Sequence, residues 1–311
     1  MKRFIFMVIM LSLSVRALFA GGEKEGADKS GKPQVVAVNF PAYDFARQIA
    51  GDQINLTMLL PPGAESHSLE PTPRDIIKIK NCAVLIYTGG ESDEWVDRIL
   101  KSMDVSKKKI VRMMEAVDPV KEEIVEGMEK EKEENIAYDE HIWTSPKNAV
   151  RIVRAIANAL CEADAANAVF FRKNAESYAA ELEKLDAEFQ AVVNSAKRKI
   201  IIFGDRFPFR YFTDAYGLKY YAAFPGCSTE TEPSAATVAF LINKIRAEKI
   251  PVVFYIELSN EKMADTIAAE TGAKKLIFHS CHNITKRDFD RGVTFLEIQK
   301  ANVPRLREAL Q

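Results

Sequence analysis

The 311-residue sequence lacks several patterns that would assign a function class directly. It has no H-E-x-x-H or comparable hydrolase spacing, which argues against a zinc hydrolase built on that motif. Its four cysteines lack paired spacing such as C-x-x-C, and the sequence alone leaves any disulfide pairing open. Basic residues are spread among acids rather than clustered, so no nucleic-acid surface is indicated.

Long apolar runs are also absent at the N-terminus. The run from Phe4 to Val15 is about a dozen residues, which is too short to cross a bilayer. A basic start and a small-residue end make residues 1–20 typical of a secretory signal, with an uncleaved anchor as the alternative. No cysteine follows Ala20, so a lipoprotein anchor is not supported. We therefore expect a periplasmic or otherwise extracytoplasmic protein.

Strand-like and helix-like runs alternate along most of the chain. Residues 21–33 are polar and glycine-rich and predict a flexible tether. Beyond them, short apolar runs such as 35–40, 56–60 and 83–87 predict strands, with amphipathic helical segments between them. Strands alternating with helices indicate an α/β fold, in which a mainly parallel sheet is covered on both faces.

The longest periodic segment divides the chain in two. Between about Ala168 and Lys197, apolar residues recur at steps of three or four. Roughly 28 residues with a rise of 1.5 Å each predict a helix about 40 Å long. A chain of this length is expected to form two domains. We predict an N-terminal lobe at 34–166 and a C-terminal lobe at 198–311, joined by one linker helix at 167–197.

The sequence has only four histidines, and each is predicted to lie in a loop or at the end of a strand. His67 lies on a proline-bounded loop after a buried strand, at the edge where open α/β sheets bind ligands. His141 immediately precedes a predicted helix, and His279 and His282 follow the last predicted strand. Histidine is a common metal ligand, but a single one carries no coordination geometry, so a core or surface role is the alternative for each.

Several segments, in the same order, resemble the signature segments of the zinc/manganese solute-binding proteins of ABC importers. The resemblance covers about residues 34 to 311. It implies two α/β lobes joined by one long helix, with a divalent metal ion bound between the lobes and handed to a membrane permease. The matching segments are PPGAESHSLEPTP at 61–73, EHIW at 140–143, YGL at 216–218, ETEPS at 230–234 and IAAETGA at 267–273.

The resemblance implies His67 and His141 as the first two metal ligands. The third departs from the family pattern, because Gly204 stands where the family usually has a histidine or glutamate, with Asp205 beside it. Asp205 is a candidate ligand, and an ion pair with a nearby arginine is its alternative. We expect a loop at 204–211.

The fourth family ligand, commonly an acid, falls near His279 and His282. Zinc sites need about four donors, and two histidines from each lobe would supply them. The alternative is that one of this pair binds the metal and the other supports it. We favour His282 slightly, because His279 is close to the end of the strand.

These observations predict a binding protein rather than an enzyme. We expect a monomeric extracytoplasmic solute-binding protein that captures Zn²⁺ and delivers it to the permease of an ABC importer, with no nucleic-acid partner. Mn²⁺ is the alternative cargo and would bring more carboxylate oxygen to the site. Two further hypotheses are a secreted zinc hydrolase with Glu65 or Glu140 as general base, and a binder of a metal chelate.

Overall fold

The computed structural model describes residues 31–65, 69–128, 136–227 and 233–311. The predicted signal at 1–20 lies outside these ranges, as does most of the predicted tether. Among the described helices, none combines the length and the apolar character needed to cross a membrane.

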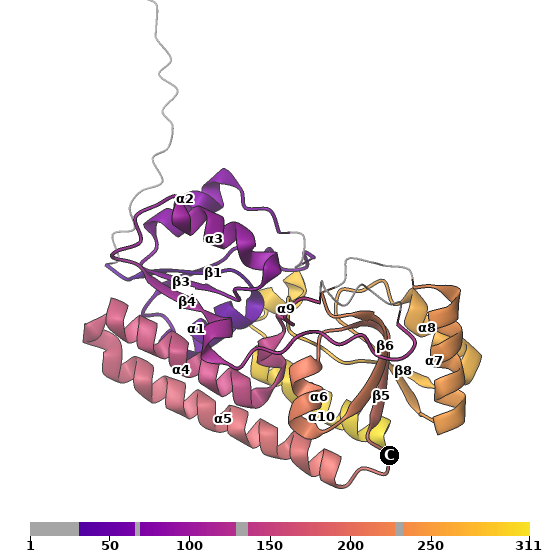
Figure 1. Cartoon of the computed structure of the whole chain (residues 1–311). Helices are drawn as coiled ribbons and strands as arrows, with labels where there is room; N and C mark the ends of the chain where they lie inside the picture. Colours follow the sequence, from indigo (N-terminus) through magenta and orange to yellow (C-terminus); the bar gives the residue numbers. More distant parts are fainter. Residues whose placement is uncertain (1–30, 66–68, 129–135, 228–232) are drawn as a thin grey trace, which may run out of the picture. The chain divides into compact units, whose positions relative to one another are not determined.

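The first lobe is a four-stranded, fully parallel sheet in the order β2-β1-β3-β4, with helices on both faces (Figure 1). Alternate residues of each strand face opposite ways: Leu85 packs toward α2 and α3, whereas Val84 and Ile86 pack toward α1 and α4. Its elements are β1 (Gln34–Ala37), α1 (Phe40–Ala50), β2 (Asn55–Met58), α2 (Pro73–Asn81), β3 (Val84–Tyr87), α3 (Glu94–Lys101), β4 (Lys109–Arg112) and α4 (Pro146–Ala163), with short 3-10 turns η1 (Glu91–Asp93), η2 (Met113–Ala116) and η4 (Ile142–Thr144).

The second lobe repeats this arrangement with the strand order β6-β5-β7-β8, again fully parallel. Ile202 and Val253 pack outward against α7 and α8, while Phe203 and Phe254 pack on the opposite face. Its elements are β5 (Ile200–Phe207), α6 (Arg210–Tyr216), β6 (Lys219–Pro225), α7 (Ala235–Glu248), β7 (Val252–Tyr255), α8 (Lys262–Thr271), β8 (Lys274–Ile277), α9 (Lys286–Asp290) and α10 (Phe295–Leu310).

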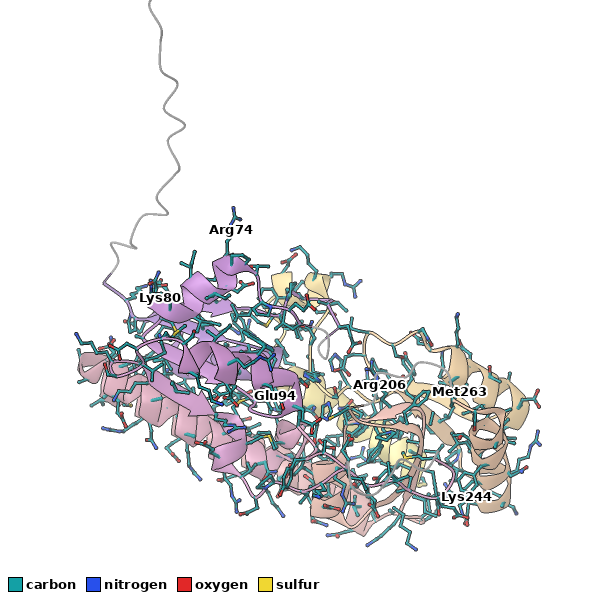
Figure 2. The ribbon with its side chains drawn as sticks, turned by 45° about the horizontal axis from the view of Figure 1, so that its top comes forward. Arg74, Lys80, Glu94, Arg206, Lys244 and Met263 are labelled. Atoms are coloured by element: carbon teal, nitrogen blue, oxygen red, sulfur yellow. The ribbon has the colours of Figure 1, made fainter. Side chains whose placement is uncertain are left out.

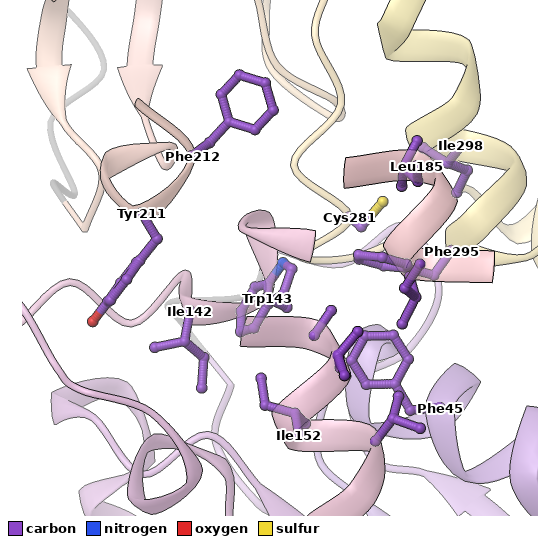
Figure 3. Close-up of a cluster of buried hydrophobic side chains, with 14 of the residues drawn as sticks. Phe45, Ile142, Trp143, Ile152, Leu185, Tyr211, Phe212, Cys281, Phe295 and Ile298 are labelled. Atoms are coloured by element: carbon purple, nitrogen blue, oxygen red, sulfur yellow. The ribbon is translucent and has the colours of Figure 1, made fainter. Parts of the chain in front are cut away.

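The predicted long helix connects the two lobes. After a short turn η5 (Ala165–Asn167), α5 runs from Ala168 to Asn194, which is 27 residues. It packs against α1, α4 and α10. One continuous apolar cluster passes from Phe45 of α1, through Trp143, to Phe212 of α6 and Phe295 of α10 (Figure 3). The predicted α/β fold of two parallel sheets flanked by helices and joined by one long helix is therefore confirmed.

The C-terminal helix α10 is absent from the sequence-based prediction. Thr294 and Glu297 form a capping box at its start, a local signal that is present in the sequence. The buried carboxylate of Asp44 on α1 accepts the amide of Phe295 at 2.8 Å, and Arg47 donates to the carbonyl of Val293 at 3.0 Å. Helix α10 thus ties the end of the chain back to the first lobe.

The prediction of a loop at 204–211 is wrong at its start, because β5 continues to Phe207. The pairing register with β6 shifts between Phe203 and Arg206, as in a β-bulge. Such an irregularity lets a strand carry Asp205 and Arg206 while Phe203 and Phe207 stay buried. The bulge therefore brings polar side chains to the carboxyl end of the second sheet.

Gly204 provides a test of this packing. A Cβ atom at Gly204 would lie 2.8 Å from Cα and 2.9 Å from N of Ala264, both backbone atoms of α8. Because α8 would have to shift, Gly204→Ala is expected to lower the free energy of unfolding by about 1–3 kcal/mol. Chemical denaturation measures this change, and an unchanged midpoint would contradict the close packing of α8 on β5.

Candidate metal centre

A cavity of about 30 Å³ lies where the strands of the second sheet end. Its walls include Gly226 after β6, Glu257 after β7 and His282 after β8, and His141 and Glu65 of the first lobe complete it. A water molecule needs about 10–15 Å³ by this measure, so the cavity has room for one ion with a water molecule. A chelate or siderophore is far larger.

His141 is buried and its ring orientation is fixed by Asp139. Nδ1 lies 3.0 Å from Oδ1 of Asp139, and the same oxygen accepts the backbone amide of His141 at 2.7 Å. A carboxylate only accepts hydrogen bonds, so Nδ1 carries the proton and Nε2 keeps a lone pair for a metal ion. Burial lowers the pKa of His141, but the charge and hydrogen bond of Asp139 and the charges of Glu140 and Glu122 outweigh it and raise the pKa above its usual value.

His282 lies next to His141, although the two residues belong to different lobes. Their ring centroids are 5.0 Å apart at an interplanar angle of 83°. Trp143 packs edge-on against His282 and donates its Nε1–H to the carbonyl of Ser280 at 2.8 Å. This bond joins the segment that carries His141 to the segment that carries His282, so both imidazoles are present at one ion-sized cavity.

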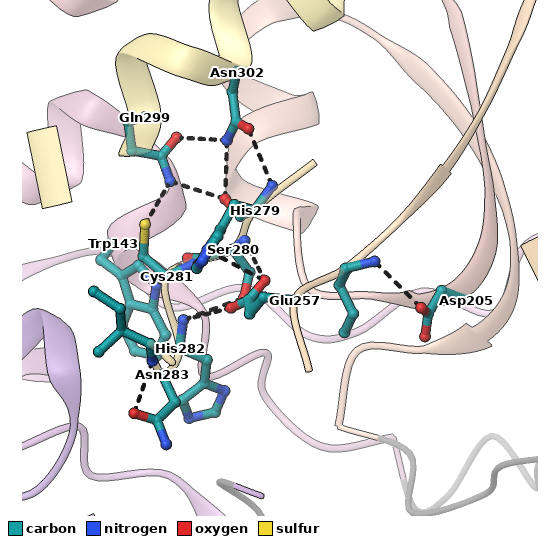
Figure 4. A network of polar contacts seen from close by, with 12 residues as sticks. Trp143, Asp205, Glu257, His279, Ser280, Cys281, His282, Asn283, Gln299 and Asn302 are labelled. Carbon is teal, nitrogen blue, oxygen red and sulfur yellow. Dashed lines mark hydrogen bonds and ion pairs between the residues drawn. The ribbon is translucent and has the colours of Figure 1, made fainter. Parts of the chain in front are cut away.

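Glu257 determines the conformation of the turn that carries His282 (Figure 4). Its carboxylate is 8% exposed and accepts three hydrogen bonds: the amide of Ser280 at 2.7 Å, the hydroxyl of Ser280 at 2.6 Å and the amide of His282 at 3.0 Å. A buried carboxylate needs such donors, because each replaces a lost contact with water. Glu257 also lines the cavity, so it places negative charge beside the two histidines.

His279 is directed into the second lobe rather than toward the cavity. Its Nδ1 accepts the amide of Cys281 at 3.0 Å, and its backbone amide and carbonyl are bonded to the side chain of Asn302 on α10. Burial lowers the pKa of His279. With its lone pair on Nδ1 occupied by an amide, His279 supports the turn and is not among the residues that line the cavity.

Asp205 also lies beside the cavity rather than in its wall. Its two oxygens accept the backbone amides of Arg206 at 2.8 Å and Ile256 at 3.2 Å, so its carboxylate joins β5 to the end of β7. Burial raises the pKa of Asp205, and the hydrogen bonds from Ser259, Arg206 and Ile256 partly offset this shift. Among the salt bridges of the described residues, Asp205 forms none with Arg206 or Arg210.

Arg206 instead faces the first lobe. Figure 2 shows it between the elements of the two sheets, whereas Arg74 points outward from α2. Its guanidinium contacts both carboxylate oxygens of Glu65, with distances of 3.1 and 3.3 Å, and both residues line the cavity. A permanent positive charge beside a cation site is unfavourable unless it is neutralised, and Glu65 supplies the neutralising charge.

The predicted ligand His67 lies outside the described residues. Ala64 and Glu65, which closely precede it in the chain, do line the cavity. Within the described ranges, no three His, Cys, Asp or Glu side chains gather as a metal-binding group. The described part of the site therefore offers two imidazoles with neighbouring carboxylates.

Two residues of the cavity, Glu257 and Arg206, were not singled out from the sequence. For Glu257 a signal existed, since a carboxylate directly after a buried strand lies at the ligand-binding edge of a parallel sheet. For Arg206 no signal existed, because its partner Glu65 is 141 residues away in the chain.

Comparisons of the sequence with known proteins identify a family and several relatives. The family model described as "Zinc-uptake complex component A periplasmic" matches residues 35–309. The chain is 31% identical to the high-affinity zinc uptake system protein ZnuA of Bacillus subtilis, over 98% of this chain and 97% of the relative. It is 28% identical to the zinc-binding lipoprotein AdcA of Streptococcus pneumoniae, over 97% of this chain but only 60% of that relative.

Solved structures show the same fold. The Zn(II)-bound ZnuA-like domain of Streptococcus pneumoniae AdcA matches with a TM-score of 0.75 and 28% identity, over 90% of this chain and 99% of that domain. The metal-dependent lipoprotein YcdH of Bacillus subtilis matches with a TM-score of 0.78 and 29% identity, over 90% of this chain and all of that chain. With the family model covering nearly the whole described chain, this protein belongs to the family of extracytoplasmic solute-binding proteins that form component A of zinc-uptake complexes.

Proposed function

We propose that this chain captures Zn²⁺ between its two lobes and delivers it to the permease of an ABC importer. One observation carries the proposal: two imidazoles from different lobes, His141 and His282, line one cavity of about 30 Å³. The hydrogen bond from His141 to Asp139 leaves Nε2 as the ligand atom. Relatives named for zinc uptake and zinc binding support zinc as the cargo.

We assign His67, His141 and His282 as the zinc ligands. The cavity wall formed by Ala64 and Glu65 supports His67, since these residues closely precede it in the chain. Three nitrogen ligands are compatible with tetrahedral zinc, and either a water molecule or the Glu257 carboxylate completes the set. In this assignment His279 and Asp205 hold the walls of the site through backbone hydrogen bonds.

The other hypotheses are less well supported. Mn²⁺ prefers oxygen ligands, whereas the described pair is nitrogen. For a hydrolase, both candidate bases are already engaged: Glu140 is 3% exposed and bonded to Ser92, and Glu65 is paired with Arg206. A metal chelate does not fit a cavity of about 30 Å³.

The location and organisation follow from the same proposal. Residues 1–20 act as the export signal and 21–33 as a tether, followed by lobes at 34–166 and 198–311 with the linker at 167–197. The relatives named as lipoproteins make membrane attachment a question to test directly. Mass spectrometry of the exported protein would give its N-terminus and any lipid, and light scattering would test the expected monomer.

Substitution of the ligands tests the site. His141→Ala and His282→Ala should each weaken zinc binding by about 3 kcal/mol, or more than 100-fold, because each removes one of the few ligands that share the binding energy. His279→Ala is the matched control within the same turn, and it should cost stability but less than tenfold in affinity. Competition titration against a chelator of known zinc affinity measures all three. Equal losses for His279→Ala and His282→Ala would contradict the assignment.

The raised pKa of His141 predicts the pH dependence of binding. Zn²⁺ binds only neutral imidazole, and a raised pKa means that protons compete at a higher pH. Affinity should therefore fall as the pH drops, beginning above the ordinary histidine pKa of about 6.5. Asp139→Asn removes the largest influence that raises this pKa, so the fall should move to lower pH while affinity at pH 8 drops about 10–100-fold. Flat affinity down to about pH 5 in the unmodified protein would exclude a histidine site.

A further inference from the structure

The segment 61–65, which leads to His67, is held by the second lobe through hydrogen bonds to its own backbone groups. The side-chain amide of Asn283 donates to the carbonyl of Pro61 at 2.9 Å and to the carbonyl of Ala64 at 2.8 Å. The amide of Gly63 donates to the carbonyl of Ile284 at 2.8 Å. These three bonds join parts of the chain that are more than 200 residues apart.

The side chain of Asn283 makes three hydrogen bonds to the backbone. Its Oδ1 accepts the amide of Ile284 at 2.8 Å, and both donated bonds leave from Nδ2. It is 2% exposed, although it lines the cavity. The amide orientation is the one that matches two carbonyl acceptors and one amide donor. Both Nδ2 bonds of Asn283 therefore hold the 61–65 segment, while its Oδ1 holds the backbone of its own turn.

One further contact brings the segment of His141 to the same turn, because Trp143 donates to the carbonyl of Ser280. A second contact holds the 61–65 segment to β5, where Arg206 pairs with Glu65. The turn at 280–284 thus contacts both first-lobe segments that carry the proposed ligands His67 and His141. All of these bonds are made by protein groups alone.

We propose that Asn283 is a positioning residue that sets zinc affinity by holding residues 61–65 against the 280–284 turn before the ion binds. This inference rests on the proposed function. It concerns a residue that is not itself a zinc ligand but holds the segment leading to one. A loop that is already ordered loses less conformational freedom on binding, so less of the binding free energy is spent on ordering it. Without the two bonds from Asn283, the 61–65 segment would become ordered only when the ion binds. The conformational entropy lost in that step would then lower the zinc affinity.

The test compares Asn283→Ala and the isosteric Asn283→Asp with Asn174→Ala in the full chain. Asn174 is a matched control, because its amide also donates to a distant carbonyl, that of Ile49 at 3.0 Å, away from the cavity. Zinc affinity is measured by chelator competition, global stability by denaturation, and local protection by amide hydrogen exchange at Gly63 in zinc-free protein. Asn283→Asp retains the shape and the acceptor for Ile284 and covers the case in which the alanine variant fails to fold.

We expect both Asn283 variants to speed exchange at Gly63, and Asn283→Ala to lose at least tenfold in zinc affinity, or about 1.4 kcal/mol. Asn283→Asp adds a negative charge to the cavity wall, so its readout is exchange at Gly63 alone. Asn174→Ala should lower stability while affinity stays within twofold and Gly63 stays protected. Unchanged exchange at Gly63 in the Asn283 variants would overturn the positioning role. Because this exchange is measured in zinc-free protein, that result does not depend on whether the chain binds zinc. Unchanged affinity despite faster exchange would overturn its effect on binding. An unmodified protein that binds no zinc would instead overturn the proposed function.

Discussion

The arrangement of the site depends on the buried carboxylate of Glu257. Three hydrogen bonds fix the turn from Ser280 to His282 against the end of β7. Several contacts between the lobes at the cavity involve this turn or its neighbours, including the bond from Trp143 and the pair from Asn283. A carboxylate without these donors would be an uncompensated buried charge, so the turn and Glu257 stabilise each other. The shape of the cavity therefore depends on the backbone of this turn as well as on the side chains that line the cavity.

The parts of the fold that depend on local patterns could be predicted from the sequence. The alternation of apolar runs predicted the parallel sheets, and the long periodic segment predicted α5. The start of α2 is equally local, because Thr72 forms a capping box with Asp75 and Pro73 is the first residue of the helix. These features succeed because a strand, a helix or a cap is decided mainly by neighbours within a few residues.

The parts that depend on distant contacts could not be predicted. The continuation of β5 beyond Phe203 depends on its pairing with β6 and on the close approach of α8, neither of which is visible locally. For the candidate site, the sequence predicted His67, His141, His279, His282 and Asp205 as metal ligands, and of these His141 and His282 line the cavity. The sequence could not separate His282 from His279. That distinction depends on the amide of Cys281, which occupies Nδ1 of His279 in the folded turn. Glu65 and Arg206 likewise acquire their relationship only when the two lobes fold together.

The close contact between Gly204 and α8 has a consequence for the release of the ion. A side chain at this position would meet the backbone of Ala264, so the proposed ligand set has no donor from Gly204. In the proposed set of three imidazoles with a water molecule as the fourth donor, the ion would keep one coordination position that an outside donor can enter. Under that proposal, an incoming ligand would replace the water before any imidazole leaves, so transfer to a receiving protein would not require the ion to become fully hydrated.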